Sequence, residues 1–209
     1  MGRVHNGRAP ATALVVVAAE IVPTGDDARG IPLTRKLASD VKGIQNAVTE
    51  IWHDDARSRS LVDVLALIDD SKLKMSGAGA MSCRADVVVV TGHGALGHLV
   101  NTAGVGQWPL DEVAREISAR LPNLGALVLA ACACDEHPTI TSSLSALARE
   151  RDLVIVGMRG SIDTDERDRI VRYLVDRAVH ADAKVVVGDA VRSAVSMLER
   201  DQRRIVVVF

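Results

Sequence analysis

The stretch Ala85-Asp-Val-Val-Val-Val-Thr-Gly-His-Gly94 decides the fold that we expect for this chain. Its four consecutive valines form a continuous apolar run, which is typical of a strand buried on both faces of a parallel sheet. The run is followed at once by a histidine between two glycines. Because functional groups collect beyond the carboxyl ends of strands in open α/β sheets, we expect His93 at a functional edge.

Further apolar runs have the same strand-like character and alternate with amphipathic helical patterns. The remaining strand-like runs are 13–18, 126–131 and 153–156, with a final edge strand at 205–209. Helical patterns are expected at about 33–52, 61–68, 110–121, 140–148, 165–179 and 189–198. This alternation predicts an α/β fold with a mostly parallel central sheet and helices on both faces.

The domain organisation follows from length and composition. With 209 residues, of which 48% are apolar and 25% charged, one domain is preferred, although two small ones would also fit the length. We expect a flexible N-terminal tail at 1–10, a single domain at 11–209, and a surface loop at 69–84. The run 11–19 resembles a signal peptide in following Arg3 and Arg8, but its β-branched residues favour the first strand.

Charge and cysteine content limit the classes of binding partner and the cellular compartment that we expect. The formal net charge is -2 and aromatic residues make up 2% of the chain, so nucleic acid is not an expected partner. No apolar stretch approaches the ~20 residues of a membrane-spanning helix, so no membrane association is expected. Cys132 and Cys134 are too close for an unstrained mutual disulfide, and reduced thiols in the cytoplasm are the simpler interpretation.

The run 126–132 repeats the arrangement of strand and functional group, with Cys132 in place of the histidine. If the two runs are adjacent parallel strands, they lie ~4.8 Å apart, and His93 and Cys132 can meet at their carboxyl ends. A thiol with a reference pKa of ~8.5 is mostly protonated near neutrality, while the thiolate is the nucleophile. His93 can remove that proton and later protonate a leaving amine, which is the role of a general acid/base.

Gly94 adds the third part of this candidate site. A glycine leaves its backbone N–H unobstructed, so the N–H groups of Gly94 and Cys132 can together form an oxyanion hole. The small side chains of Ala130 and Ala131 leave room for a substrate strand. The three residues His93, Gly94 and Cys132 therefore predict acyl transfer by a cysteine nucleophile.

The two segments, Gly92-His93-Gly94 and Ala131-Cys132, each after an apolar strand, resemble the caspase-like clan of cysteine peptidases. Three further stretches are similar to its CHAT branch, namely Trp108-Pro-Leu-Asp-Glu112, the segment 153–165, and Gly188-Asp-Ala-Val-Arg-Ser-Ala194. The stretch Leu37-Ala-Ser-Asp40-Val-Lys-Gly is similar to the first helix of that fold. The resemblance covers about residues 11–209.

This resemblance implies a three-layer caspase-like sandwich and a cysteine endopeptidase without a cofactor or a metal. It assigns the nucleophile to Cys132, the histidine of the dyad to His93 and the oxyanion glycine to Gly94. The implied substrate is a protein or peptide, and a separately encoded protein partner is expected to regulate the enzyme. Ala130 stands where metacaspases have an aspartate, so their preference for basic residues is not carried over.

Other interpretations of the same residues remain open. Cys134 is a competing nucleophile. Gly92 to Gly97 also fits the G-x-G-x-x-G dinucleotide fingerprint, although the helix that this fingerprint requires does not follow it. Zinc is an alternative ligand, because His93, Cys132 and Cys134 could converge with the two histidines His98 and His137.

Two further points are left undecided by the sequence. Asp163 and Asp165 follow the fourth strand-like run and either contact a basic side chain of the substrate or cap the following helix. The same holds for Asp135 and Glu136. The chain is alternatively a caspase-like interaction module with an intact but idle dyad, acting in a signalling or defence assembly.

Overall fold

The computed structural model describes residues 13–17, 47–50, 86–100, 107–181 and 185–209. The tail at 1–10, the helix at 61–68 and the loop at 69–84 lie outside these ranges and stay predictions. In β1, in β2 and at His93, Val100 and Gln107, the description is confined to the backbone.

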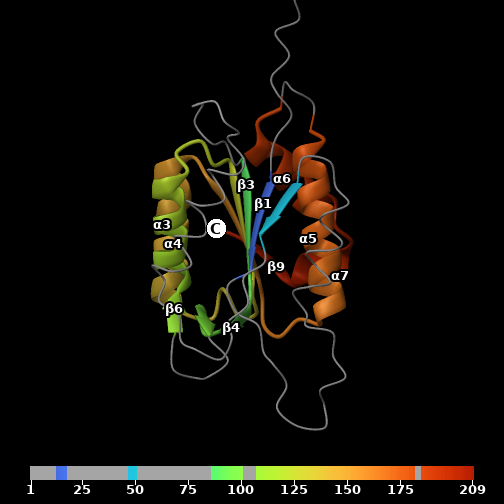
Figure 1. Ribbon diagram of the computed structural model, residues 1–209. Helices are drawn as coiled ribbons and strands as arrows, with labels where there is room; N and C mark the ends of the chain where they lie inside the picture. Colours follow the sequence, from blue (N-terminus) through green and yellow to red (C-terminus); the bar gives the residue numbers. More distant parts are fainter. Residues whose placement is uncertain (1–12, 18–46, 51–85, 101–106, 182–184) are drawn as a thin grey trace, which may run out of the picture.

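A six-stranded sheet forms the centre of the molecule (Figure 1). Its strands, in spatial order, are β2 (Ala47–Glu50), β1 (Ala13–Val17), β3 (Val87–Thr91), β7 (Ala126–Ala130), β8 (Val154–Met158) and β9 (Val206–Val208). The strands from β2 to β8 are parallel to their neighbours, and β9 is antiparallel to β8. The predicted mostly parallel sheet and the predicted edge strand near the end of the chain are confirmed.

Helices cover both faces of this sheet (Figure 1). One layer contains α3 (Leu110–Arg120) and α4 (Pro138–Arg151), and the other contains α5 (Thr164–Val179) and α6 (Val187–Met197). A short helix, α7 (Arg200–Arg204), precedes β9. The predicted three-layer α/β sandwich is therefore confirmed.

The continuous apolar runs divide between the two layers because successive side chains of a strand point to opposite faces. Val88 and Val90 belong to the core cluster under α3 and α4, whereas Val87 and Val89 belong to the cluster under α5 and α6. Leu127 and Val128 divide in the same way, and all of these side chains are fully buried. Each contributes roughly 1.5–3 kcal/mol by leaving water, which explains why these strands lie at the centre.

The structure corrects the prediction at its N-terminal side. The segment 33–52 was expected to be helical, but Ala47–Glu50 is strand β2 and pairs with β1 in parallel. The rest of that segment lies outside the described residues. Pairing with β1 overrides the helical preference of this segment. A strand at a sheet edge is stabilised by backbone hydrogen bonds to its neighbour, and these bonds cannot be predicted from its own sequence.

A second, three-stranded sheet was also missed. It contains β4 (His93–Ala95), β5 (His98–Val100) and β6 (Gln107–Pro109), all antiparallel to their neighbours. Strands of three residues are too short to give a hydrophobic period. This small sheet begins directly after β3 in the chain. Because β4 contains His93, the pairing of β4 with β5 sets the path of the backbone around His93.

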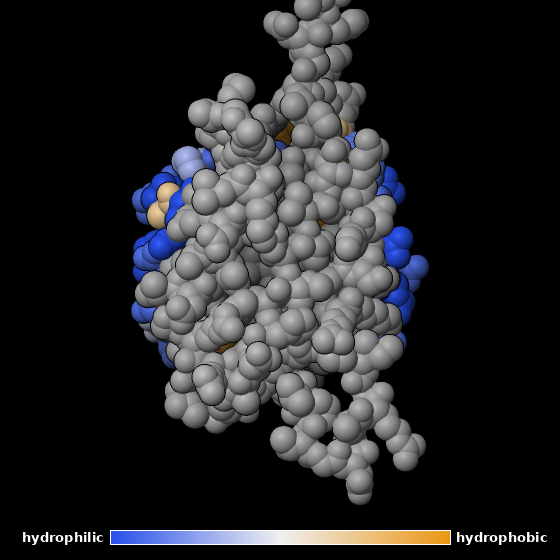
Figure 2. Space-filling view, viewed as in Figure 1, coloured by the Kyte–Doolittle hydropathy of each residue, from blue (hydrophilic) through white to orange (hydrophobic). Residues whose placement is uncertain are grey.

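Polar residues dominate the outer faces of the two helical layers, as Figure 2 shows at both sides of the molecule. Their inner faces carry the apolar residues, such as Ile117 in α3 and Leu174 in α5, which are buried. Among the helices in the described ranges, none combines the length and apolarity needed to cross a bilayer.

Candidate active site

Strands β3 and β7 are direct neighbours in the sheet, as the sequence predicted. They pair in parallel, with Thr91 opposite Ala130 at their carboxyl ends. The Thr91 hydroxyl donates to the Ala130 carbonyl oxygen at 3.3 Å, and the Gly92 N–H donates to the same oxygen at 3.4 Å. The segments that begin at Gly92 and Ala131 therefore leave the sheet side by side.

Beyond the sheet, Gly94 lies against the peptide group of Cys132. A Cβ atom built at position 94 would overlap the Cys132 carbonyl oxygen and lie 2.7 Å from the Cys132 nitrogen and 2.9 Å from the Ala131 Cβ. Only glycine permits this approach. His93, whose backbone belongs to β4, is thus carried next to Cys132, but its imidazole lies outside the described structure.

A tight turn joins β4 to β5 and docks onto the cysteine segment. Leu96 and Gly97 form the turn and both have positive φ, 49° and 75°. The Gly97 N–H donates to the Ala133 carbonyl oxygen at 2.9 Å. Together with the contact of Gly94, this bond fixes the β4–β5 hairpin to the segment that carries Cys132.

The segment 131–137, which we call the cysteine turn, is held from its other side by the loop after β8. The Ala133 N–H donates to Gly160 and the Cys134 N–H to Met158, each at 2.9 Å. Ala133 has a φ of 56°, a left-handed conformation that is uncommon for alanine. The turn is consequently locked between the hairpin and the β8–α5 loop.

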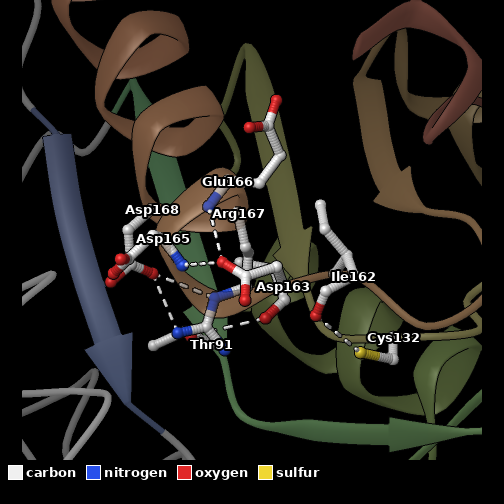
Figure 3. Close-up of polar contacts among 9 residues, drawn as sticks. Thr91, Cys132, Ile162, Asp163, Asp165, Glu166, Arg167 and Asp168 are labelled. Carbon is white, nitrogen blue, oxygen red and sulfur yellow. Dashed lines mark hydrogen bonds and ion pairs between the residues drawn. The ribbon is translucent and has the colours of Figure 1, made fainter. Parts of the chain in front are cut away.

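Cys132 is partly buried and lies at the surface of this arrangement. Its sulfur is 4.0 Å from the carbonyl oxygen of Ile162, on the loop that leads into α5 (Figure 3). Cys132 is therefore partly exposed as a residue, and its sulfur has only this one long contact of its kind in the described part of the protein.

Cys134 is placed differently, and its burial argues against it as the nucleophile. Its side chain is fully buried, with the sulfur 3.0 Å from the Ala131 carbonyl oxygen and 3.5 Å from that of Leu129. Burial raises the pKa of the Cys134 thiol from its ordinary value of 9.0 to about 12. A thiol that is neutral and enclosed at physiological pH cannot attack a peptide.

Asp163 caps helix α5. Its Oδ1 accepts hydrogen bonds from the N–H groups of Asp165 at 2.8 Å and Glu166 at 3.4 Å (Figure 3). Asp165 and Glu166 occupy the first turn of α5, where negative charge complements the helix dipole. The capping interpretation is therefore realised for Asp163, while a contact of Asp163 or Asp165 with substrate stays a prediction.

Two ion pairs, one at the cysteine turn and one at the start of α5, were not predicted. Asp135 of the cysteine turn lies 3.3 Å from the guanidinium of Arg159 on the β8–α5 loop. Arg167 and Asp168, in the first turns of α5, form a pair at 2.8 Å with side chains only 6% and 2% exposed (Figure 3). Adjacent charges near a helix start carry no sequence signal of burial, because such residues are usually solvated.

The zinc alternative gains no support from the described residues. The rings of His98 and His137 meet edge to face, with centroids 5.8 Å apart. Yet no group of three or more potential metal-ligating side chains occurs within the described ranges. The dinucleotide fingerprint also lacks its context, because Gly97 is followed by strand β5 rather than by a helix.

A cavity of about 260 Å³ lies between the C-terminal part of α5 and α6, with Asp176, His180, Val185 and Met197 among its lining residues. Cys132 instead contacts the loop before the N-terminus of α5. A 16-residue helix is about 24 Å long, so this cavity and the candidate site lie at opposite ends of α5.

A comparison with solved structures finds the X-ray structure of a secreted C11 cysteine protease from Bacteroides thetaiotaomicron, determined in complex with an irreversible peptide inhibitor. The identity is 13% and the TM-score 0.47, and the alignment covers 89% of this chain and 59% of the other. The chain thus spans less than two thirds of that protein. At this level, the likeness carries no argument about activity. No family model and no curated protein matches the chain.

The burial of Cys134 predicts a pH dependence of stability. Below pH 9 the thiol is protonated in both folded and unfolded chains, but between pH 9 and 12 only the unfolded chain releases the proton. The free energy of unfolding should therefore fall as pH rises, by about 1 kcal/mol between pH 8 and pH 10 from this group. Urea unfolding at both pH values should show this loss in the wild type and not in Cys134→Ala. The Cys132→Ala control should keep this loss. An equal fall in the free energy of unfolding between the two pH values in all three proteins would contradict the burial of Cys134.

The capping role of Asp163 predicts a split between two substitutions. Asp163→Ala removes the acceptor of two helix N–H groups and should lower the free energy of unfolding by about 1 kcal/mol. Asp163→Asn is the matched control, since asparagine caps nearly as well and changes only the charge. Chemical denaturation measures both effects. An alanine variant as stable as the wild type would contradict the cap.

Proposed function

We propose that this chain is a cysteine endopeptidase in which Cys132 is the nucleophile and His93 the general acid/base. The observation that carries the proposal is the close approach of Gly94 to the Cys132 peptide. It brings the residue next to His93 into contact with the residue that bears the thiol. Segments 39 residues apart in sequence, 132 minus 93, thereby become neighbours at the carboxyl edge of the sheet.

The first step is the attack of the Cys132 sulfur on a peptide carbonyl carbon. His93 accepts the thiol proton, and the thiolate forms a C–S bond while the carbonyl π electrons move to oxygen. The partial exposure of Cys132 supports this role. The Cys132 thiol donates only a weak hydrogen bond to the Ile162 carbonyl oxygen at 4.0 Å, so its proton can be transferred to the imidazole.

The negative oxygen of the tetrahedral intermediate requires hydrogen-bond donors. The N–H groups of Ala133 and Cys134 are occupied by backbone carbonyls, whereas the Cys132 N–H has no acceptor within the described part of the chain. Gly94 pairs with Leu99 next to the two-residue turn. The pair that closes such a turn is normally hydrogen-bonded, and bonded positions alternate, so the Gly94 N–H points away from β5. Since neither N–H group has an acceptor among the described residues, both support the proposed oxyanion hole.

The remaining steps complete the reaction. The intermediate collapses as the C–N bond breaks, and His93 returns its proton to the leaving amine, which gives a thioester on Cys132. Water then attacks the thioester carbon with His93 as the base. A carboxylic acid leaves and the Cys132 thiol is restored, so no cofactor or metal is needed in the cycle.

The finer assignments belong to the same proposal. The sequence resemblance supports a caspase-like peptidase of the CHAT type that acts on a protein or peptide. Asp163 and Asp165, both exposed at the start of α5, are candidates for contact with a basic side chain of the substrate. We further propose regulation by a separately encoded partner and action in the cytoplasm, where a free thiol at Cys132 stays reduced.

The assignment of the dyad predicts distinct results for three variants. Cys132→Ala should abolish both peptide cleavage and labelling by a thiol-directed peptide warhead. His93→Ala should reduce the cleavage rate by about 10²–10⁴-fold, the usual contribution of a general acid/base. Cys134→Ala is the matched control and should keep both. Cleavage of a peptide library and intact-protein mass spectrometry of the labelled chain measure these effects.

Two results would contradict the proposal. Labelling that persists in Cys132→Ala and disappears in Cys134→Ala would reassign the nucleophile. Labelling of Cys132 without turnover of any library peptide would instead favour the alternative of an idle interaction module.

A further inference from the structure

Leu96, at the tip of the β4–β5 hairpin, combines two unfavourable features. Its side chain is 60% exposed, although leucine is among the most apolar residues. Its φ of 49° lies in the left-handed region, where a residue with a Cβ is strained. Neither burial nor a relaxed backbone explains a leucine at this position.

The type of turn makes a leucine at position 96 still more unusual. A two-residue turn with positive φ at both positions is best formed by Asn-Gly, Asp-Gly or Gly-Gly. Gly97 satisfies its position, but Leu96 does not. The Leu96 carbonyl oxygen is 2.8 Å from the Nδ1 of His98, which holds the strained conformation in place. Strained residues of this kind concentrate at active sites and ligand contacts.

The hairpin that carries Leu96 is docked on the cysteine turn. Gly94 contacts the Cys132 peptide, and the Gly97 N–H bonds to Ala133, so both flanks of Leu96 are fixed to the cysteine turn. Leu96 is one residue from the second anchor, and its Cα is therefore about 3.8 Å from that of Gly97. Leu96 therefore belongs to a segment that is docked on the cysteine turn, and its side chain is exposed at the surface of that segment.

We propose that Leu96 is a specificity-determining residue that contacts an apolar side chain of the peptide substrate. The inference rests on the proposed peptidase function and adds a substrate class to it. A leucine side chain offers neither hydrogen bonds nor charge, so its partner must be apolar to gain from the contact. The strained turn holds the side chain outward in advance, which lowers the entropy lost when the peptide binds.

The test compares Leu96→Asn with the wild type in stability and in labelling. Asparagine tolerates the left-handed conformation, so the variant should have a higher Tm. Its second-order rate of labelling by a leucine-containing peptide warhead should fall about tenfold, the scale of a small apolar contact. Labelling by a glycine-containing warhead and by iodoacetamide should be unchanged. Met197→Asn, at a residue 67% exposed beside the distant cavity, is the matched control and should alter none of these rates.

Each other outcome overturns a defined part of the account. A higher Tm with unchanged labelling by both peptides would show that Leu96 has no substrate role. A parallel loss of iodoacetamide labelling would mean that the hairpin merely positions the thiol, and would also overturn the specificity role. If iodoacetamide labels wild-type Cys132 but no peptide warhead does, the proposed peptidase function itself fails.

Discussion

The parallel pairing of β3 with β7 is the constraint on which the rest of the site depends. Thr91 lies opposite Ala130, so the two chains leave the sheet at the same edge and at the same height. The register is held by fully buried valines and leucines on both faces of the two strands, and a slip of one residue would turn each of them to the wrong layer. The hydrophobic core therefore sets the register from which the segments of Gly94 and Cys132 start, and the hydrogen bonds beyond the sheet then hold these segments together.

Two glycines then allow the β4–β5 hairpin to pack against the cysteine turn. At position 94 no side chain fits against the Cys132 peptide, and at position 97 the positive φ turns the chain back toward β5. The hydrogen bond from Gly97 to Ala133 and those from the cysteine turn to the β8–α5 loop join three segments around one thiol. Cys134 serves this framework from inside, since its buried sulfur bonds to carbonyls of the turn and of β7.

The sequence predicted the layers and the central strands because each buried run is long enough to show its character. Val87 to Val90 can hardly be anything but a buried strand, and α3 to α6 follow clear amphipathic patterns. Strand β2 was missed because Ala47–Glu50 has no apolar period and owes its conformation to β1. For the site, adjacency of the two strand ends followed from topology alone. The distinction between Cys132 and Cys134 did not, because it depends on where the chain turns after Ala130, and the strained Leu96 is visible only as a backbone angle.

The central claim is that residue 93 and residue 132 are neighbours, and a disulfide measures it most directly. His93→Cys, made in a Cys83→Ser and Cys134→Ala background, leaves two thiols, at positions 93 and 132. A disulfide requires Cα atoms about 4.4–6.8 Å apart, which neighbouring strand ends provide. The account predicts that mild oxidation of the folded variant gives an intramolecular disulfide, seen by mass spectrometry as the loss of two hydrogens and of both maleimide-reactive thiols. A folded variant that keeps both thiols reactive under the same oxidant would contradict it.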